Sequence, residues 1–339
     1  MRHTSTVIRA TLALLLGSLL AVPTAAAATP DSAQRQIIDL GTLGGQFTIS
    51  EALAVNDRGQ VVGDSITAGL GPEHAFLWAN GTMRDLGTLG GLTSIATDIN
   101  NHGQVVGVSA TATGDSHAFL WVNGHMRDLG TLGGSFSVAQ AINDHGQVVG
   151  TSTTATGQAQ HAFLWTHGRM RDLGLAASAT ANDVNDRGQI TGGVPLAEAF
   201  HAYRLQHGRL VDLDSAEVPY SEGMAINEGG QVAGNSAPAA AATNHAYLWS
   251  RGQRIDLGTL GGDFSSASGL NDHGAVVGQS TTAAGGGRGF VWRHGTMTDL
   301  GVLVADGMNG SRANDINNHG WIVGASDAAG GDFHAVLWR

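Results

Sequence analysis

Three short motifs recur along the chain at matched intervals, and this repetition restricts the possible folds more than any other feature. Asp-Leu (usually Asp-Leu-Gly), N-x-x-G, and HAFLW or a variant of it each occur seven times, with 40 to 46 residues between successive copies. Asp-Leu begins at residues 39, 85, 128, 172, 212, 256 and 299; N-x-x-G begins at 56, 100, 143, 185, 227, 271 and 317; and the HAFLW motif begins at 74, 117, 161, 201, 245, 288 and 334. A repeated unit of this length must pack against its neighbours to bury its apolar side chains, so we expect a repeat architecture.

Each copy contains the signals of four short strands, as the third copy illustrates. "SVAQAIN" (137–143) predicts the first strand, and the Asn-Asp-His-Gly that follows its apolar run is typical of a type I turn. "QVVGTS" (147–152) predicts the second strand, "HAFLW" (161–165) the third and "RMRDLG" (169–174) the fourth. Four strands in roughly 40 to 50 residues are typical of one blade of a β-propeller.

The two ends of the chain are out of phase with this repeat. The chain stops at "HAVLWR", directly after a third strand, and its first strand signal, "RQIIDLG" (35–41), is a fourth strand. We therefore predict an all-β, seven-bladed β-propeller with four antiparallel strands per blade, whose ring is closed when residues 35–41 complete the blade of residues 311–339. A β-solenoid is the alternative, although it would need capping ends. The blades are expected near residues 50–89, 94–132, 137–175, 179–214, 221–259, 265–302 and 311–339.

The HAF triplets at 74–76, 117–119 and 161–163 give the chain a family resemblance. Over about residues 36–339 it resembles the HAF-repeat family of secreted bacterial proteins. The resemblance implies a repeat fold and export, and it implies no established activity. The fourth copy departs from the motif with Leu205 in place of Trp, the sixth has Arg288 in place of His, and the crossings into copies four, five and seven lack a full Thr-Leu-Gly-Gly.

Residues 1–28 are typical of a secretory signal peptide. Arg2 and Arg9 supply a basic start, residues 11–22 are apolar, and an A-x-A site precedes expected cleavage near Ala28. The apolar stretch is shorter than the about 20 residues that cross a membrane, and no later stretch reaches that length. We therefore expect residues 29–339 to be one propeller domain that is secreted to the periplasm or the extracellular medium, without a membrane span and as a monomer.

Composition excludes several classes of function. The formal net charge of −11 argues against nucleic acid or an anionic membrane surface as a partner, because both require basic patches. The absence of cysteine excludes disulfides, thiolate metal sites and Cys nucleophiles. Abundant glycine (51 residues) with only 13% charged residues favours short strands and tight turns.

"DLGTLGG" at residues 39–45 looks like the beginning of a phosphate-binding loop. The string recurs in full at 85, 128 and 256, and no helical pattern follows any copy, whereas a phosphate loop is a single strand-to-helix site. We interpret it as the crossing from the outermost strand of one blade to the innermost strand of the next, where glycine adopts conformations that other residues avoid.

Two further motifs suggest metal sites, and both have simpler interpretations. The HAF histidines lie on separate blades, too far apart to share an ion, so each is expected to hydrogen-bond the Asp of the following Asp-Leu. "DINNHG" (98–103, 315–320) and "DVNDRG" (183–188) resemble calcium loops, but His or Arg stands where an oxygen ligand is needed, so hairpin turns are expected and calcium is a minor alternative. We expect no metal and no cofactor.

The alternating strand direction places the two short turns of the repeat, N-x-x-G and W-x-x-G, on one face of the ring. The variable loops and the Gly-rich crossings lie on the other face, which we call the loop-bearing face and expect to carry the site. The second residue of the first strand varies between copies, and Glu51, Glu222 and Arg312 at this position are expected to converge at the channel mouth. The irregular crossings after Asp-Leu 212 and 299 add further polar residues. The predicted ligand-binding residues are Glu51, Asp214, Glu217, Tyr220, Glu222, Asp306, Asn309 and Arg312.

No catalytic motif accompanies these residues, so we expect a binding or interaction module rather than an enzyme, with an extracellular glycan, another polymer or a protein as its partner. A secreted polysaccharide lyase or glycoside hydrolase is the alternative, with Glu51 and Glu222, or Tyr220 and Arg312, in catalytic roles. A structural envelope or matrix protein without a small ligand is a third possibility. The polar residues would then be ordinary solvated surface.

Overall fold

The computed structural model describes residues 35–44, 49–68, 71–214, 218–237, 243–304, 310–329 and 332–339. The predicted signal peptide and three predicted ligand contacts (Glu217, Asp306 and Asn309) lie outside these ranges. Every regular element of the described residues is a β-strand, and none of these residues belongs to an apolar helix of membrane-spanning length.

The strands form four-stranded antiparallel groups, which we number as repeats 1 to 7. Repeat 1 has β2 (Ser50–Val55), β3 (Val61–Ile66), β4 (Glu73–Ala79) and β5 (Thr82–Asp85); repeat 2 has β6 (Gly90–Ile99), β7 (Val105–Thr111), β8 (Ser116–Val122) and β9 (His125–Asp128). Repeat 3 has β10 (Gly133–Ile142), β11 (Val148–Thr154), β12 (Gly157–Thr166) and β13 (Arg169–Asp172); repeat 4 has β14 (Asp183–Val184), β15 (Ile190–Leu196), β16 (Ala199–Gln206) and β17 (Arg209–Asp212).

Repeat 5 has β18 (Tyr220–Ile226), β19 (Val232–Ala237), β20 (His245–Ser250) and β21 (Gln253–Asp256); repeat 6 has β22 (Gly261–Leu270), β23 (Val276–Thr282), β24 (Gly287–Arg293) and β25 (Thr296–Asp299). Repeat 7 has β26 (Ser311–Ile316), β27 (Ile322–Asp327), β28 (Phe333–Trp338) and β1 (Ile37–Asp39). A single parallel residue pair links repeat 2 to repeat 3 and another links repeat 4 to repeat 5.

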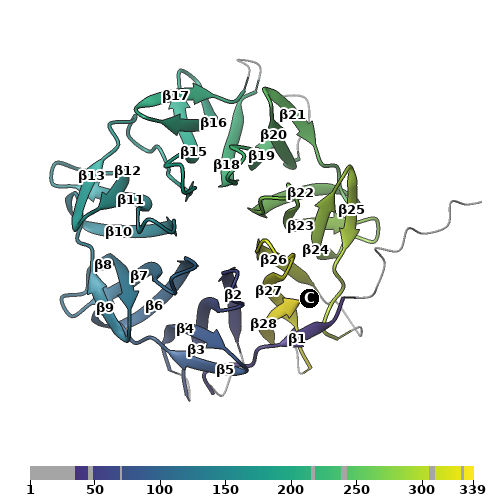
Figure 1. Cartoon of the computed structure of the whole chain (residues 1–339), viewed down its shortest axis with the longest axis horizontal. Coiled ribbons are helices and arrows are strands. Elements are labelled where there is room, and N and C mark those ends of the chain that lie inside the picture. Colours follow the sequence, from purple (N-terminus) through teal and green to yellow (C-terminus); the bar gives the residue numbers. More distant parts are fainter. Residues whose placement is uncertain are drawn as a thin grey trace, which may run out of the picture. The chain divides into compact units, whose positions relative to one another are not determined.

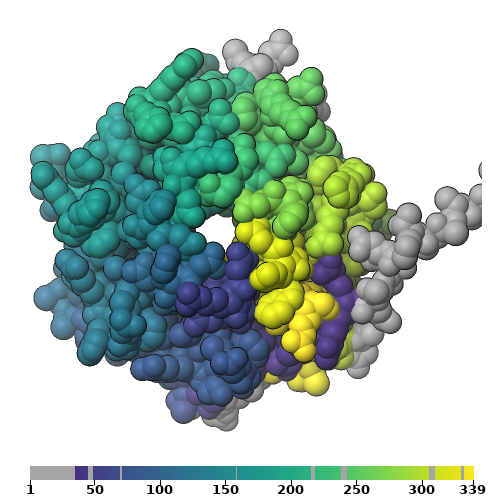
Figure 2. All heavy atoms as spheres, viewed as in Figure 1, coloured from purple at the N-terminus to yellow at the C-terminus, as the bar shows by residue number. Residues whose placement is uncertain are grey.

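The sheets are arranged around a central opening, with the first strand of each repeat innermost and the fourth at the rim (Figure 1). The space-filling view shows the same opening between the sheets (Figure 2). The order of four strands predicted for each copy is the observed one. β6, β10 and β22 begin earlier than predicted, because the last two glycines of their Thr-Leu-Gly-Gly already belong to the inner strand.

The first and last described segments of the chain pair with each other. β1 runs antiparallel to β28, with Ile37 opposite Trp338 and Asp39 opposite Val336. Beyond the strand, the Leu40 N–H donates to the Ala335 carbonyl at 2.9 Å. Repeat 7 therefore takes its outer strand from the opposite end of the described chain.

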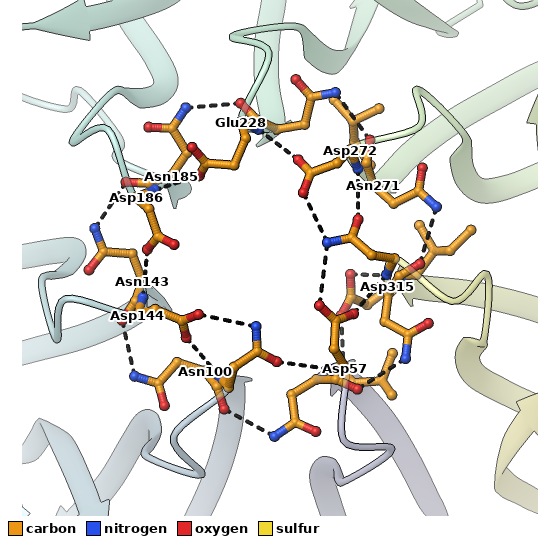
Figure 3. Close-up of a pocket in the computed structure, with 18 of the residues that line it drawn as sticks. Asp57, Asn100, Asn143, Asp144, Asn185, Asp186, Glu228, Asn271, Asp272 and Asp315 are labelled. Atoms are coloured by element: carbon orange, nitrogen blue, oxygen red, sulfur yellow. Dashed lines mark hydrogen bonds between the residues drawn. The ribbon is translucent and has the colours of Figure 1, made fainter.

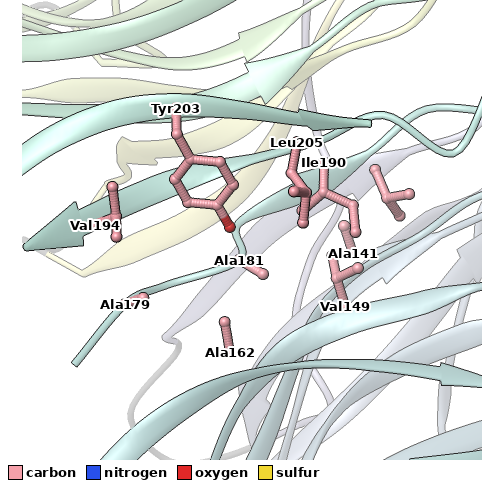
Figure 4. Close-up of a cluster of buried hydrophobic side chains, with 10 residues drawn as sticks. Ala141, Val149, Ala162, Ala179, Ala181, Ile190, Val194, Tyr203 and Leu205 are labelled. Carbon is pink, nitrogen blue, oxygen red and sulfur yellow. The ribbon is translucent and has the colours of Figure 1, made fainter. Parts of the chain in front are cut away.

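The apolar core lies between neighbouring repeats. Figure 4 shows one such cluster, in which Ala141 and Val149 of repeat 3 pack with Tyr203 and Leu205 of repeat 4. Leu205, which replaces the Trp of other copies, is buried there. An equivalent cluster joins repeat 7 to repeat 1, with Leu40 among its residues. Each sheet thus buries both faces against its neighbours, which is the packing of a propeller.

Local hydrogen bonds explain the repeated motifs. The predicted His–Asp bond is confirmed in the six HAF copies that carry His, with Nδ1–Oδ2 distances from 2.8 to 3.0 Å, and His334 makes it to Asp39 of β1. In the N-x-x-G turns the Gly N–H donates to the Asn carbonyl, at 3.0 Å for Gly59. Gly59 has φ of +74° and faces Trp321, so a side chain there would be both strained and obstructed.

Candidate functional site

One end of the central opening carries the N-x-x-G turns. There the Asn of every N-x-x-G motif links its repeat to the next. Asn143 is 5% exposed, and its Oδ1 accepts the backbone N–H groups of His145 and Gln147. Its Nδ2 donates to Gln147 Oε1 at 2.7 Å and to the Asn185 carbonyl at 2.9 Å. The same Nδ2-to-carbonyl bond occurs at each boundary, and the series returns from Asn317 to the Asn56 carbonyl at 3.0 Å.

The residues that directly follow these asparagines form a second series of hydrogen bonds between repeats at the same end (Figure 3). Its backbone N–H donates to the side chain of its counterpart in the next repeat, as in Asp186 N–H to Glu228 Oε1 at 2.6 Å. These residues surround a cavity of about 210 Å³. They are Asp57, Asn101, Asp144, Asp186, Glu228, Asp272 and Asn318.

The carboxylates that line this cavity accept hydrogen bonds from backbone N–H groups and Asn side chains of neighbouring repeats. Asn318 donates to Asp272 at 2.9 Å, and Asn101 donates to Asp144 at 3.1 Å, so the two amides separate neighbouring negative charges. Within the described residues, no group of three or more His, Asp or Glu side chains is arranged to hold a metal ion. The residues that line the cavity join each repeat to the next.

The aspartates that begin the three calcium-like motifs lie just inside this end. Asp183 accepts the N–H of Val184 and, at 2.7 Å, the N–H of Ile226 in the next repeat. Asp98 and Asp315 make the same pair of bonds. Burial raises the pKa of Asp183 to about 7 and that of Asp315 to about 6. In the other four repeats this position is Ala or Gly, so no two adjacent repeats both place an aspartate here.

At the loop-bearing end, a polar and aromatic cluster lies between repeats 4 and 5. The Phe200 and Tyr220 rings stack with centroids 5.7 Å apart and an interplanar angle of 12°. The Tyr220 hydroxyl donates to Glu222 Oε2 at 2.9 Å, while Thr180 and Asn182 both donate to Oε1 at 2.8 Å. Tyr220 is nevertheless 40% exposed. Burial, with the charge of Glu222 second, raises the pKa of Tyr220 to about 12, so its hydroxyl stays protonated.

A related cluster lies between repeats 7 and 1. Arg312 forms a two-point ion pair with Glu51, and Asn314 Nδ2 donates to Glu51 Oε1 at 2.7 Å. The Arg312 guanidinium lies 5.3 Å from the centre of the Phe333 ring, a cation–π contact. The Arg312 side chain is 40% exposed.

Two carboxyl groups that the sequence did not single out complete this second cluster. Asp64 lies directly across the β2–β3 pair from Glu51 and is hydrogen-bonded to Glu73. Burial first, then the bond to Glu73 and the charges of Glu73 and Glu51, raise the pKa of Asp64 to about 8. Asp64 occupies a position that is Val, Thr, Gly, Asn, Gln or Ala in the other copies, so its departure from the repeat was visible in the sequence.

The structure corrects two details of the predicted site. Glu51 and Arg312 meet as predicted, but Glu222 does not join them, because β2 and β18 lie on opposite sides of the opening (Figure 1). The Asp214 side chain is only 1% exposed and is bonded to Arg254 and Ser221. Asp214 therefore belongs to the packing of the crossing, and we leave it out of the site.

The raised pKa of Asp64 predicts how stability depends on pH. The folded chain favours the protonated carboxyl, whereas an unfolded Asp has a pKa of about 3.9, so this stabilisation is complete below about pH 4 and is lost as the pH rises through about 8. D64N stays neutral and can still donate to Glu73. Its melting temperature, measured from pH 5 to 8, should fall less steeply than that of the wild type. D263N, which alters an exposed carboxylate, should follow the wild type, and a D64N curve parallel to the wild type would contradict the prediction.

No protein-family model and no curated protein matches the chain. Among solved structures, the β-propeller domain of the trilobed protease from Pyrococcus furiosus, described as having an open velcro topology, superposes with a TM-score of 0.62 at 10% identity, over 87% of this chain and 94% of that domain. Pyrococcus horikoshii acylaminoacyl peptidase gives 0.58 at 10% identity, over 89% of this chain and 52% of its own. A Mycobacterium tuberculosis puromycin-hydrolyzing peptidase gives 0.56 at 13%, over 84% and 50%.

The chain thus spans about half the length of these two peptidases. At such low identity the likeness establishes the fold alone. The antiparallel four-stranded sheets, their face-to-face packing and these structural relatives together define the protein as a β-propeller.

Proposed function

We propose that this protein is a secreted β-propeller that binds an extracellular polysaccharide through its loop-bearing face. The observation that carries the proposal is the exposed Tyr220 ring, held by Phe200 beside the carboxylate of Glu222, at a crossing that departs from the repeat. An aromatic ring offers an apolar surface to the C–H face of a sugar, and a carboxylate accepts hydrogen bonds from sugar hydroxyls. Export rests on the signal-peptide pattern, and membership of the HAF-repeat family rests on the motifs.

The proposal includes a rigid scaffold, namely seven blades in a ring that is closed by the pairing of β1 with β28. Two features support closure: the series of Asn side-chain bonds that returns from Asn317 to Asn56, and the apolar cluster between repeats 7 and 1. Closure would remove the open sheet edges of the ring and fix the loops in position.

The binding proposal predicts a specific loss in Y220A. Removing the ring should weaken polysaccharide binding about tenfold or more, which corresponds to about 1.4 kcal/mol. It should lower the melting temperature by only about 2–4 °C, because Tyr220 is 40% exposed and loses one ring contact and one hydrogen bond. The purified protein is first screened against xylan, mannan, β-glucan, chitin and polygalacturonate, and Kd for the best ligand is then compared between variants. L92A, which truncates a more exposed apolar side chain, is the matched control. Equal binding by Y220A and the wild type would remove this site from consideration.

A second function, polysaccharide cleavage, is favoured by one specific observation. Asp64 retains its proton in the presence of Glu73 and Glu51, and a carboxylic acid beside carboxylates is the arrangement used in general acid–base catalysis. The Glu51–Glu222 pair suggested by the sequence lies on β2 and β18, which face each other across the opening (Figure 1). The same screen, scored for released reducing ends as well as binding, distinguishes the two functions: release that is lost in D64N would favour the enzyme, and binding without release would favour the module.

A further inference from the structure

The clusters at the 4/5 and 7/1 boundaries are built from the same positions of the repeat. Each has a Phe directly before the His of the HAF-type motif, namely Phe200 and Phe333. Each also has an Asn three residues before the N-x-x-G motif of the same repeat, and a Glu five residues before the N-x-x-G motif of the following repeat. The Asn–Glu pairs are Asn182 with Glu222 and Asn314 with Glu51.

These three positions vary independently elsewhere in the chain. The residue before the HAF-type motif is Glu, Ser, Gln, Asn or Gly in the other five repeats. The residue at the position of Asn182 and Asn314 is Leu, Thr, Gln, Met or Ser. The Glu position is Ile, Val, Thr, Ser or Arg at the other five boundaries. Since the blade tolerates all these residues, the joint occurrence of Phe, Asn and Glu at two boundaries is not required by the fold.

The geometry of the two clusters also matches. Asn182 bridges the Glu222 carboxylate and the Gly223 carbonyl at 2.8 and 2.9 Å, and Asn314 bridges the Glu51 carboxylate and the Ala52 carbonyl at 2.7 and 2.9 Å. In each cluster one further side chain packs on the Phe and bonds the same Glu. This side chain is Tyr220 at the first boundary and Arg312 at the second.

The two clusters lie on opposite sides of the central opening, since β18 and β2 face each other across it (Figure 1). A single sugar could occupy only one of them, whereas an extended chain could contact both. Both clusters present a carboxylate. In the second cluster Arg312 pairs with Glu51 and Asp64 keeps its proton, while Glu73 adds a further carboxylate. The whole chain carries a formal charge of −11. Such surroundings repel a polyanion and suit a polymer that offers hydroxyl donors.

We infer that the 4/5 and 7/1 clusters are two equivalent subsites for one neutral polysaccharide chain that lies across the loop-bearing end of the opening. The inference rests on the proposed function and adds to it a ligand class and a number of subsites. Two linked contacts bind a polymer more tightly than either contact alone, because the second contact forms within the complex.

The test compares the isosteric variants E222Q and E51Q with their double variant, and with S266A, which alters the same position at the 5/6 boundary. Kd is measured for xylan, mannan and β-glucan, with polygalacturonate as the anionic probe, and folding is verified by circular dichroism. Each single change should weaken binding of the neutral polymer about tenfold or more, and the double change should abolish it. Short oligosaccharides of the same polymer should bind the wild type at two sites and each single variant at one. S266A should bind as the wild type.

The outcomes separate the inference from the function on which it rests. If E222Q weakens binding and E51Q does not, the second subsite is refuted and the binding module stands. If polygalacturonate binds more tightly than every neutral polymer, the ligand class is wrong. If the wild type binds neither these four probes nor chitin, the proposed function itself fails. Should E51Q not fold, F333L replaces it, since this variant keeps Glu51 and Arg312 and removes only the aromatic ring.

Discussion

A chain that starts at Thr42 is expected to melt about 10 °C or more below a chain that starts at Arg35. The shorter chain lacks β1 and therefore leaves β28 without its outer neighbour. It also loses Leu40, which is buried, and Ile37 and Ile38, which pack against the apolar clusters of repeat 7. Burial of each such side chain contributes about 1.5–3 kcal/mol, and in a domain of this size each kcal/mol shifts the melting temperature by about 2 °C.

The measurement is thermal unfolding followed by circular dichroism, combined with light scattering, because an uncovered β28 would be an aggregation-prone edge. L40A in the longer chain provides a milder variant, and L257A is its matched control, since both leucines follow the Asp of the same motif and are 6% exposed. Both substitutions should cost about 2–4 kcal/mol. A chain from Thr42 that melts within about 2 °C of the longer chain would show that β1 does not hold the ring together.

N143A is expected to lower the free energy of unfolding by about 3–5 kcal/mol, which is at the upper end for a single substitution. The change leaves the buried Asn185 carbonyl and the half-buried N–H groups of His145 and Gln147 without their partner. Each buried polar group that loses its bond costs about 1–3 kcal/mol. The bond to Asn185 also joins two repeats, so the loss weakens an interface as well as a turn.

Urea unfolding measures this free energy, with H145A as the control in the same turn. His145 is exposed, so its truncation should change the free energy by no more than about 0.5 kcal/mol. N317A extends the test to the boundary between repeats 7 and 1, where the same side-chain bond reaches Asn56. Similar losses in N143A and N317A would support a closed ring, whereas a loss in N143A no greater than that in H145A would refute the structural role of these asparagines.

The parts of the fold that were predictable are those governed by local chemistry and by the period. The N-x-x-G turns and the His–Asp bonds join residues at most 11 positions apart, with the bond of His334 to Asp39 as the exception. The four strands of each repeat follow from side-chain alternation between these turns. The predicted role of "DLGTLGG" is confirmed in the described copies: Gly87 has φ of +76° and connects β5 to β6, and its N–H is bonded to Asp85 at 2.7 Å. A glycine-dependent turn can be recognised from its own residues.

The candidate site was predictable only in part, because its contacts cross the boundaries between repeats. The sequence showed that Glu51, Glu222 and Arg312 depart from the repeat, and it could not show which of them meet. Glu51 and Arg312 are 261 residues apart and come together because the last repeat lies beside the first. Asp214 looked like an exposed polar residue of an irregular crossing, and the structure turns it inward to Arg254.

By itself, the sequence determined the length of the repeat, the four strands in each copy and the positions at which the copies differ, because these depend on turn chemistry and side-chain alternation within about 45 residues. The tertiary structure decided which differing residues share a site. The pairing of Asn182 with Glu222 and of Asn314 with Glu51, and the protonated Asp64 beside Glu73, arise only when sheets pack face to face and exclude water from the groups between them.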